Sequence, residues 1–575
     1  MSPNISSHSK KYSYSKIRAH AKRVVSEKIT FLNRSGKTII GYYDHQLNKN
    51  SDLLVVISPG YAETKKDYIS LAYYLSSNGL DVIRYDNSYH LGESQGEIFE
   101  TDPIHMVEDL SSTLDYVQEN LGYSSCGVVA SSLSGRIALR VATKDSRIKA
   151  LVSLVGVVDL QKSLLSVYRE DIIREYGLGR RWDSLDLFGH EVKGTIIKSI
   201  VENGLHDLQG TCEDVQRLGI PVTFIAAERD VWVDLKDVRK VYEASLSGKT
   251  ELCVIPGSLH QIQENPRRAK DVICKIVLAC LRHLGHKKVN ASSVKEPDIR
   301  EIVFQNKIEL VELKKLTTVT RNGERVFWGD YLSRYSIAYR SADFKEFLDF
   351  VGDLLGNVVF GEKILDAGCG NGLFGAWLTE RSRLNAERCS RGDWGSKPLF
   401  QYFGLDFSYP GLLDAAHRHE RCVAELYAGS WAAVQPEFGY ILGDLDEGLP
   451  FLSSTFDKIN CNLVISYVSD AQLVLRGLMR SLKEGGKLSV SSLKPYCDLS
   501  LIYRNYADST ITDKERQEAK ALLSSTGQIR KKEGEGHYRF FTGPELQELL
   551  VQAGARRVKV VRTFGDQANV AVGEK

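Results

Sequence analysis

Residues 127–136 read GVVASSLSGR, and this stretch decides the fold of the first half of the chain. A short apolar run is followed by small residues and then, near Ile137, by a helical pattern, which predicts a strand, a tight turn and a helix. Such a turn lifts one hydroxyl out of the sheet, beside free N–H groups of the helix that can stabilise an oxyanion. Ser132 is therefore a candidate nucleophile.

Short apolar runs on both sides of this stretch alternate with helical patterns and predict further buried strands. With residues 127–130, these runs are 53–57, 81–85, 151–155, 222–226 and 252–255. The alternation predicts an α/β domain with a mostly parallel sheet, in which working residues gather beyond the carboxyl ends of the strands. Asp230 and His260 each follow one of the last two runs, so the chain order is Ser, Asp, His.

A serine hydroxyl needs a histidine to take its proton and a carboxylate to hold that histidine in the right tautomer. The spacing of the Gly-x-Ser-x-Gly motif is kept here, but Ala130 and Ser134 replace both glycines. A serine-rich turn that only caps a helix would also explain the stretch. Asp230 and His260 would also fit ordinary loop residues, and Asp234 is an alternative acid.

Several irregular motifs between residues 50 and 265 closely resemble the acyl-transferase of bacterial bioluminescence operons. In order, they are RYD (84–86), HLGESQG (90–96), ASSLSGR (130–136), VGVVD (155–159), DVWV (230–233) and GSLH (257–260). That family is an α/β-hydrolase thioesterase that releases fatty acid from acyl carrier protein. The resemblance implies an acyl-enzyme on Ser132, with His260 as general base, Asp230 as orienting acid and acyl carrier protein as partner.

The resemblance also implies an oxyanion hole, formed by the backbone N–H of Leu133 and by one from Gly60 or Tyr61. Residues 160–210 are too long for a simple connection between strands. We expect them to cap the site and to shape a tunnel for the acyl chain.

The second half carries DAGCGNG at residues 366–372, after an apolar strand end and before a helical pattern. Gly368, Gly370 and Gly372 would let the backbone turn sharply and approach a ligand closely. The same region also satisfies Gly-x-Gly-x-x-Gly, which by itself leaves a dinucleotide-binding fold open.

Later motifs, together with this loop, resemble class I methyltransferases over residues 360–560. They are YFGLD (402–406), GDLD (443–446), LPF (449–451), FDKI (456–459), NLVIS (462–466) and LKEGGKL (482–488). The resemblance implies a Rossmann-like domain that binds S-adenosylmethionine, with Asp406 at the ribose, Asp444 near the adenine and the glycines along the methionyl part. Asp366 and Asn462 complete the candidate cofactor-binding residues.

The methyl acceptor is less clearly indicated. An aromatic segment at residues 327–340 would close over the cofactor, with Arg334 or Arg340 holding an anion, although an amphipathic helix with core aromatics explains it equally well. His537 would be a base for a hydroxyl acceptor, whereas a carboxylate acceptor needs none. Residues 381–401 form a long link that we expect to be a surface loop or a partner contact.

Length and composition limit the class of protein. A chain of 575 residues favours at least two domains, and we expect a basic tail (1–29), a hydrolase domain (30–285), a linker (286–325) and a methyltransferase domain (326–575). Hydrophobic residues make up 43% and charged residues 26%, and no apolar run approaches the roughly 20 residues that span a bilayer. The tail is best explained by disorder or a solvated helix, and a transit peptide or a segment that binds an acidic partner would also explain it.

Charge and cysteine usage exclude further classes. The net charge of +2 gives no case for nucleic-acid binding. The ten cysteines are scattered without a Cys-x-x-Cys pair, which indicates reduced thiols in a cytoplasmic protein without a disulfide framework or a metal site.

The two signatures together predict a bifunctional enzyme of a lipid or polyketide-like pathway. Its first domain would release an acyl chain from a carrier-protein thioester, and its second would methylate the released acid to a methyl ester. Two alternatives stay open. One is methylation of a hydroxyl, amine or carbon of the carrier-bound intermediate before release, and the other is a non-catalytic first domain that only docks the carrier.

Overall fold

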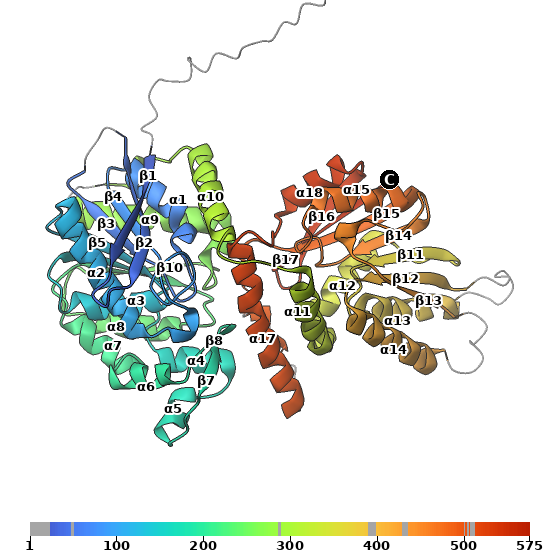
Figure 1. The fold of residues 1–575 in the computed structure, drawn as a ribbon, viewed down its shortest axis with the longest axis horizontal. Helices are drawn as coiled ribbons and strands as arrows, with labels where there is room; N and C mark the ends of the chain where they lie inside the picture. Colours follow the sequence, from blue (N-terminus) through green and yellow to red (C-terminus); the bar gives the residue numbers. More distant parts are fainter. Residues whose placement is uncertain are drawn as a thin grey trace, which may run out of the picture.

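The computed structural model of the chain describes residues 24–47, 51–285, 289–388, 398–427, 435–498, 501–502, 505–506 and 512–575. Two separate sheets form its two halves, with the helices α10 (Ile299–Lys314) and α17 (Asp513–Gly534) between them (Figure 1). The basic segment at residues 8–23 lies outside the described residues, as does most of the link after residue 388.

The first sheet has eight strands in the order β1-β2-β4-β3-β5-β6-β9-β10. Their bounds are β1 (Val24–Leu32), β2 (Thr38–Gln46), β3 (Leu54–Ser58), β4 (Asp81–Tyr85), β5 (Cys126–Ser131), β6 (Ile148–Leu154), β9 (Val222–Ala227) and β10 (Glu251–Ile255). The six strands β3, β4, β5, β6, β9 and β10 are parallel to one another, which confirms the six predicted strands and the α/β fold class. The antiparallel pair β1 and β2 was not predicted, and residues 24–29 belong to it rather than to a basic tail.

Helices cover both faces of this sheet because successive strand residues point to opposite sides. On one face lie α1 (Ile69–Ser77) and α9 (Pro266–Gly285), packed on Val55, Val129 and Ile225. On the other face lie α2 (Pro103–Leu121), α3 (Leu133–Ala142), α7 (Leu208–Gln216) and α8 (Leu235–Ala244). Between β6 and α7 come α4 (Leu160–Tyr168), α5 (Ile172–Gly177), β7 (Ser184–Leu187), β8 (His190–Lys193) and α6 (Thr195–Glu202), which we call the cap.

The second sheet has seven strands in the order β13-β12-β11-β14-β15-β17-β16. Their bounds are β11 (Glu362–Ala367), β12 (Phe400–Asp406), β13 (Glu437–Leu442), β14 (Phe456–Cys461), β15 (Leu482–Leu493), β16 (Arg556–Thr563) and β17 (Ala568–Glu574). β17 alone runs in the opposite direction to the other six strands of this sheet. The main flanking helices are α12 (Ala342–Leu355), α13 (Leu373–Arg388), α14 (Tyr409–Leu426), α15 (Ala471–Ser481) and α18 (Gly543–Gln552). The strand order reverses beside β11, where the glycine loop begins, as in doubly wound sheets that bind ligands.

Residues 298–325, which the sequence left unplaced, are largely helical. They form α10 and the start of α11 (Arg321–Arg334). A buried ionic cluster fastens α10 to the first sheet, because Arg84 on β4 pairs with Asp44 on β2 (2.7 Å) and with Glu309 on α10 (2.7 Å). All three side chains are at most 1% exposed.

Removing one member of this cluster should destabilise the first half strongly. In Glu309→Ala, two N–H groups of the Arg84 guanidinium lose a buried acceptor, although Asp44 and the Lys65 carbonyl still accept from Arg84, and a buried donor left without its acceptor costs about 1–3 kcal/mol. Urea unfolding would measure this loss. Glu312→Ala on the same helix removes an exposed pair with Lys315 and should change the unfolding free energy by less than about 0.5 kcal/mol. Equal effects of the two variants would contradict the importance of the cluster.

Two properties of the described residues bear on function. No helix in these ranges combines the length and the apolar character needed to span a membrane. In the same ranges, no group of three or more histidine, cysteine or acidic side chains is arranged to hold a metal ion.

Candidate active sites in the two halves

Ser132 lies on a sharp turn between β5 and α3. Its backbone has φ +50° and ψ −121°, a strained conformation for a residue with a side chain. Helix α3 begins directly after it at Leu133, earlier than the predicted start near Ile137. The position at this turn that requires a glycine is Gly135, because a Cβ there would lie 2.8 Å from Cα of Gly156. Ala130 and Ser134 are therefore tolerated in place of the usual glycines.

Three predicted residues form a hydrogen-bonded chain at the carboxyl ends of the strands. The Ser132 hydroxyl donates to Nε2 of His260 (3.0 Å), and Nδ1–H of His260 donates to Oδ2 of Asp230 (2.8 Å). The other oxygen of Asp230 accepts the N–H groups of Trp232 and Val233, which fixes its orientation. The alternative acid Asp234 instead caps α8 and pairs with Lys162.

The electrostatic surroundings favour a protonated His260. Burial lowers its pKa, but the negative charges of Asp230, Asp498 and Glu63 outweigh burial and raise the pKa above the ordinary value. The indole of Trp232 stacks on the imidazole, with ring centroids 5.1 Å apart. His260 can therefore take the proton of Ser132, and Asp230 can stabilise the resulting imidazolium.

The candidate oxyanion donors differ in availability. The N–H of Gly60 donates to the carboxylate of Glu63 (2.6 Å), so this donor is already engaged. Leu133 is the first residue of α3, where a backbone N–H has no partner within the helix. Tyr61 and Leu133 both line the cavity beside Ser132. Of the predicted donors, these two are better placed than Gly60.

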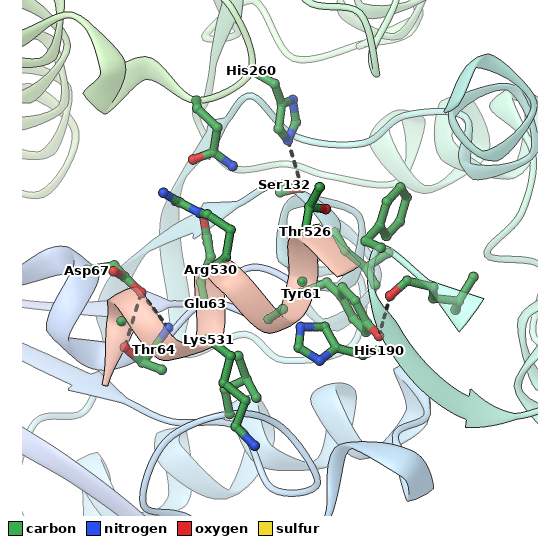
Figure 2. A pocket seen from close by; sticks show the side chains of 18 of the residues that line it. Tyr61, Glu63, Thr64, Asp67, Ser132, His190, His260, Thr526, Arg530 and Lys531 are labelled. Carbon is green, nitrogen blue, oxygen red and sulfur yellow. Dashed lines mark hydrogen bonds between the residues drawn. The ribbon is translucent and has the colours of Figure 1, made fainter. Parts of the chain in front are cut away.

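A cavity of ≈ 260 Å³ contains Ser132 and His260. Its lining includes five apolar residues of the cap: Leu160, Leu164, Phe188, Ile196 and Ile200. The second half of the chain also contributes to the lining, because α17 crosses the cavity carrying Thr526, Arg530 and Lys531 (Figure 2).

Two acids near His260 were missed by sequence reasoning. Glu63 follows β3 and accepts the Tyr68 hydroxyl as well as the Gly60 N–H. Asp498, 2% exposed, follows β15 in the second half and lines the same cavity as His260. No local motif marks Asp498, because only the packing of the two halves brings it to the site.

The second cavity, of ≈ 190 Å³, lies over the glycine loop after β11. Gly368 (φ +76°) and Gly370 (φ +54°) line it in backbone conformations that suit glycine. A Cβ on Gly368 would lie 2.4 Å from Val464, and one on Gly370 would lie 2.8 Å from Leu332. Gly372 packs against Ala415 of α14 instead of lining the cavity.

The predicted polar residues gather around this cavity. Asp366, Asp406, Asp444 and Asn462 all line it. Asp366 accepts hydrogen bonds from Tyr402 and Asn460 (both 2.7 Å), and burial raises its pKa to about 6. Asp406 accepts the N–H groups of Gly370 and Ser408 (both 2.8 Å), and burial likewise raises its pKa to about 6.

These residues fit S-adenosylmethionine. Each carboxylate oxygen of Asp406 has room for a second donor, such as a ribose hydroxyl. The buried side-chain nitrogen of Asn462 and oxygen of Asn460 have no partner among the described residues. Unpartnered buried polar atoms at a cavity are suited to a polar ligand. Asp444 pairs with Arg321 (2.9 Å) at the edge of the cavity.

The aromatic segment is helical and lines the same cavity. Trp328, Tyr331 and Tyr335 face it, as expected. The arginines do not follow the expectation, because Arg334 pairs with Asp330 and Arg340 with Glu515, while Arg321 lines the cavity. His537 also lies outside the cavity lining, which removes the geometric case for it as a base.

His419 on α14 is a further residue that the sequence did not reveal. Its Nε2–H donates to the carbonyl of Gly372 (2.8 Å), and its other ring nitrogen bonds the Tyr440 hydroxyl. Burial lowers its pKa to about 4, so the ring is neutral. His419 therefore stabilises the backbone of the glycine loop through the Gly372 carbonyl. A lone histidine in a helical pattern gives no signal for such a role.

Comparisons with known proteins agree with this division of the chain. A family model described as acyl transferase matches residues 41–309, and one described as methyltransferase domain matches residues 360–535. The acyl transferase of Photobacterium phosphoreum is 30% identical over 222 residues, which cover 38% of this chain and 72% of that protein. The acyl transferase of Aliivibrio fischeri is 34% identical over 218 residues, covering 38% and 69%.

Similar solved structures were also found. Est1E from Butyrivibrio proteoclasticus, solved with ferulic acid, aligns with 45% of this chain and 99% of its own at 17% identity and a TM-score of 0.37.

Proposed function

Since the chain belongs to the acyl transferase family through its first half and carries a methyltransferase domain in its second, we propose that it releases an acyl group from a carrier-protein thioester and methylates the released acid. The observation that carries the proposal is the hydrogen-bonded chain of Ser132, His260 and Asp230 in a cavity that the methyltransferase half closes. A methyl ester is the product expected if the second half methylates the acid that the first half releases.

The acyl step uses groups that already lie in contact. His260 takes the proton of Ser132, and the serine oxygen attacks the thioester carbon, while the N–H groups of Leu133 and Tyr61 hold the oxyanion. The carbon–sulfur bond breaks, the leaving thiol receives the proton from His260, and an ester forms on Ser132. A water molecule, deprotonated by His260, then attacks this ester and releases the acid together with the regenerated serine.

The methyl step places different demands on the protein. Bound S-adenosylmethionine supplies a methyl group on a sulfonium, and a carboxylate accepts it without a protein base. Asp406 would hold the ribose, and Trp328, Tyr331 and Tyr335 would exclude water from the cavity. Arg321 would offer a cation at the cavity edge, although Asp444 and Asp446 already partly neutralise it.

The direct test supplies acyl carrier thioesters and isotopically labelled S-adenosylmethionine to the full chain. We expect free acid and a labelled methyl ester. Free acid without labelled product would contradict the methyl ester step. Labelled carrier-bound product from Ser132→Ala would favour methylation before release, and failure of a fluorophosphonate to label Ser132 would favour a first domain that only docks the carrier.

The pH dependence of acyl transfer should report the charges around His260. His260 acts as a base only when neutral, so activity should rise as the pH passes through its raised pKa. Burial raises the pKa of Asp498 to about 6, and above that pH its charge helps to hold the proton on His260. Asp498→Asn should therefore move the midpoint of the kcat/KM profile to lower pH.

Ester hydrolysis followed across the pH range measures this midpoint. Asp513→Asn removes an exposed acid from α17, 86% exposed in its side chain, and should leave the midpoint unchanged. A midpoint that stays in place or rises in Asp498→Asn would contradict the assigned effect of its charge.

A further inference from the structure

The acyl cavity is closed by the methyltransferase half of the chain. The cap and loops of the first half line part of it, and the segment after β15 lines it together with α17, which crosses it in Figure 2. The second half contributes Tyr496, Cys497, Asp498, Leu523, Thr526 and Gly527, among other lining residues. A substrate attached to Ser132 therefore contacts residues of both halves.

Contacts between the halves fix the position of α17. Gly527 of α17 meets Gly189 of the cap backbone to backbone, since a Cβ on Gly189 would lie 2.3 Å from the Gly527 nitrogen. Lys520 pairs with Glu170 of the cap (3.0 Å). The distance between α17 and the cap at this point is thus set by a close glycine contact that admits no larger residue.

A second contact joins the segment after β15 to the loop that carries His260. Lys494 pairs with Glu264 (3.0 Å), and both side chains are at most 7% exposed. Loss of one partner of a buried ion pair strongly destabilises the folded protein. The pair of Lys494 and Glu264 therefore helps to keep these two segments together. The segment after β15, which carries Asp498, is thus held at the loop of His260, while α17 is held at the cap.

Two side chains on one face of α17 line the cavity that contains Ser132. Leu523 and Thr526 are three residues apart, which places them on one face of the helix, and both are nearly buried in the cavity lining. Leu160, Leu164 and Ile196 of the cap line the same cavity. One turn further along α17, Arg530 pairs with Glu533 (2.7 Å), so charged groups bound the apolar wall.

We propose, on the basis of the acyl transfer proposed above, that Leu523 and Thr526 of α17 determine which acyl chain Ser132 accepts. The ligand is the apolar acyl chain of the thioester, held between the cap and α17. The methyltransferase half thereby selects the acyl group that it will later receive as an acid. A side chain that grows on this wall shortens the accepted acyl chain, and one that shrinks lengthens it.

The test compares acyl-length profiles. The substrates are p-nitrophenyl esters of straight-chain fatty acids from butyrate to palmitate, and kcat/KM is measured for each. Thr526→Leu should lower kcat/KM for the longest accepted chain, relative to butyrate, by about tenfold or more, the range for misfit in an apolar pocket. Leu523→Ala should shift the profile in the opposite direction, towards longer chains.

Gln517→Leu is the matched control, because it adds the same side chain at an exposed position of α17 outside the cavity lining. Its profile should match that of the unchanged protein. An unchanged profile in both cavity variants, or an equal fall for every chain length, would overturn the proposal. If the unchanged protein neither hydrolyses any ester nor reacts with a fluorophosphonate, the proposed acyl transfer by Ser132 is contradicted. That outcome is distinguishable from an unchanged length profile in an active protein, which contradicts only the role of α17.

Discussion

Ser132→Ala is expected to lower acyl transfer by about 10⁴-fold or more, because loss of one member of such a hydrogen-bonded chain disables the whole unit. The Ser132 hydroxyl is the only one that donates to His260 among the described residues. Release of acid from an acyl carrier thioester measures the loss. Mass spectrometry of the intact protein should also show no acyl adduct on the variant.

The second cavity provides the internal control for this variant. Ser132 does not line it, so binding of S-adenosylmethionine, measured by calorimetry, should be unchanged. Ser111→Ala on α2, whose hydroxyl only donates to the carbonyl of Val107, should retain acyl transfer. Substantial acid release by Ser132→Ala, with its fold intact, would reject the serine as nucleophile.

Asp406→Ala is expected to weaken S-adenosylmethionine binding by about 10²-fold, because it removes the charged acceptor for the ribose hydroxyls. Part of this loss comes from the glycine loop, since Asp406 also accepts the Gly370 N–H. Asp406→Asn keeps one acceptor oxygen and should lose less. Calorimetry on all three proteins separates these cases.

Acyl transfer should survive the change at Asp406. The residue lies outside the acyl cavity, so fluorophosphonate labelling of Ser132 should proceed as in the unchanged protein. Asp414→Ala removes an exposed acid from α14 and should leave cofactor affinity unaltered. Equal affinity in Asp406→Ala and the unchanged protein would reject the ribose assignment.

Sequence reasoning succeeded where a residue's role depends on its chain neighbours. All six predicted strands of the first sheet were found, because buried parallel strands are continuous apolar runs. It missed β1, whose nine residues are mostly exposed or half-buried and therefore lack such a run. It also left residues 298–325 open, where α10 is helical but shows only a weak amphipathic pattern.

The sequence does not reveal which oxyanion donors and which anion-binding arginines are free to bind a ligand. Gly60 stands at the expected place after β3, yet its N–H is taken by Glu63, which only the folded loop reveals. Arg334 and Arg340 belong to the right segment, yet helix geometry turns them to Asp330 and Glu515. Which donor or cation is free depends on the partners that folding supplies.

From local pattern alone it follows that Ser132 stands on a strand–turn–helix, that an acid and a histidine follow later strands, and that a glycine loop follows β11. Each of these depends on residues adjacent in the chain. Packing between the halves alone places α17 and Asp498 at the cavity of Ser132, because the contacts responsible, Gly189 with Gly527 and Glu264 with Lys494, join residues far apart in the chain. No periodicity or motif spacing encodes such contacts, which arise from the fit of two folded surfaces.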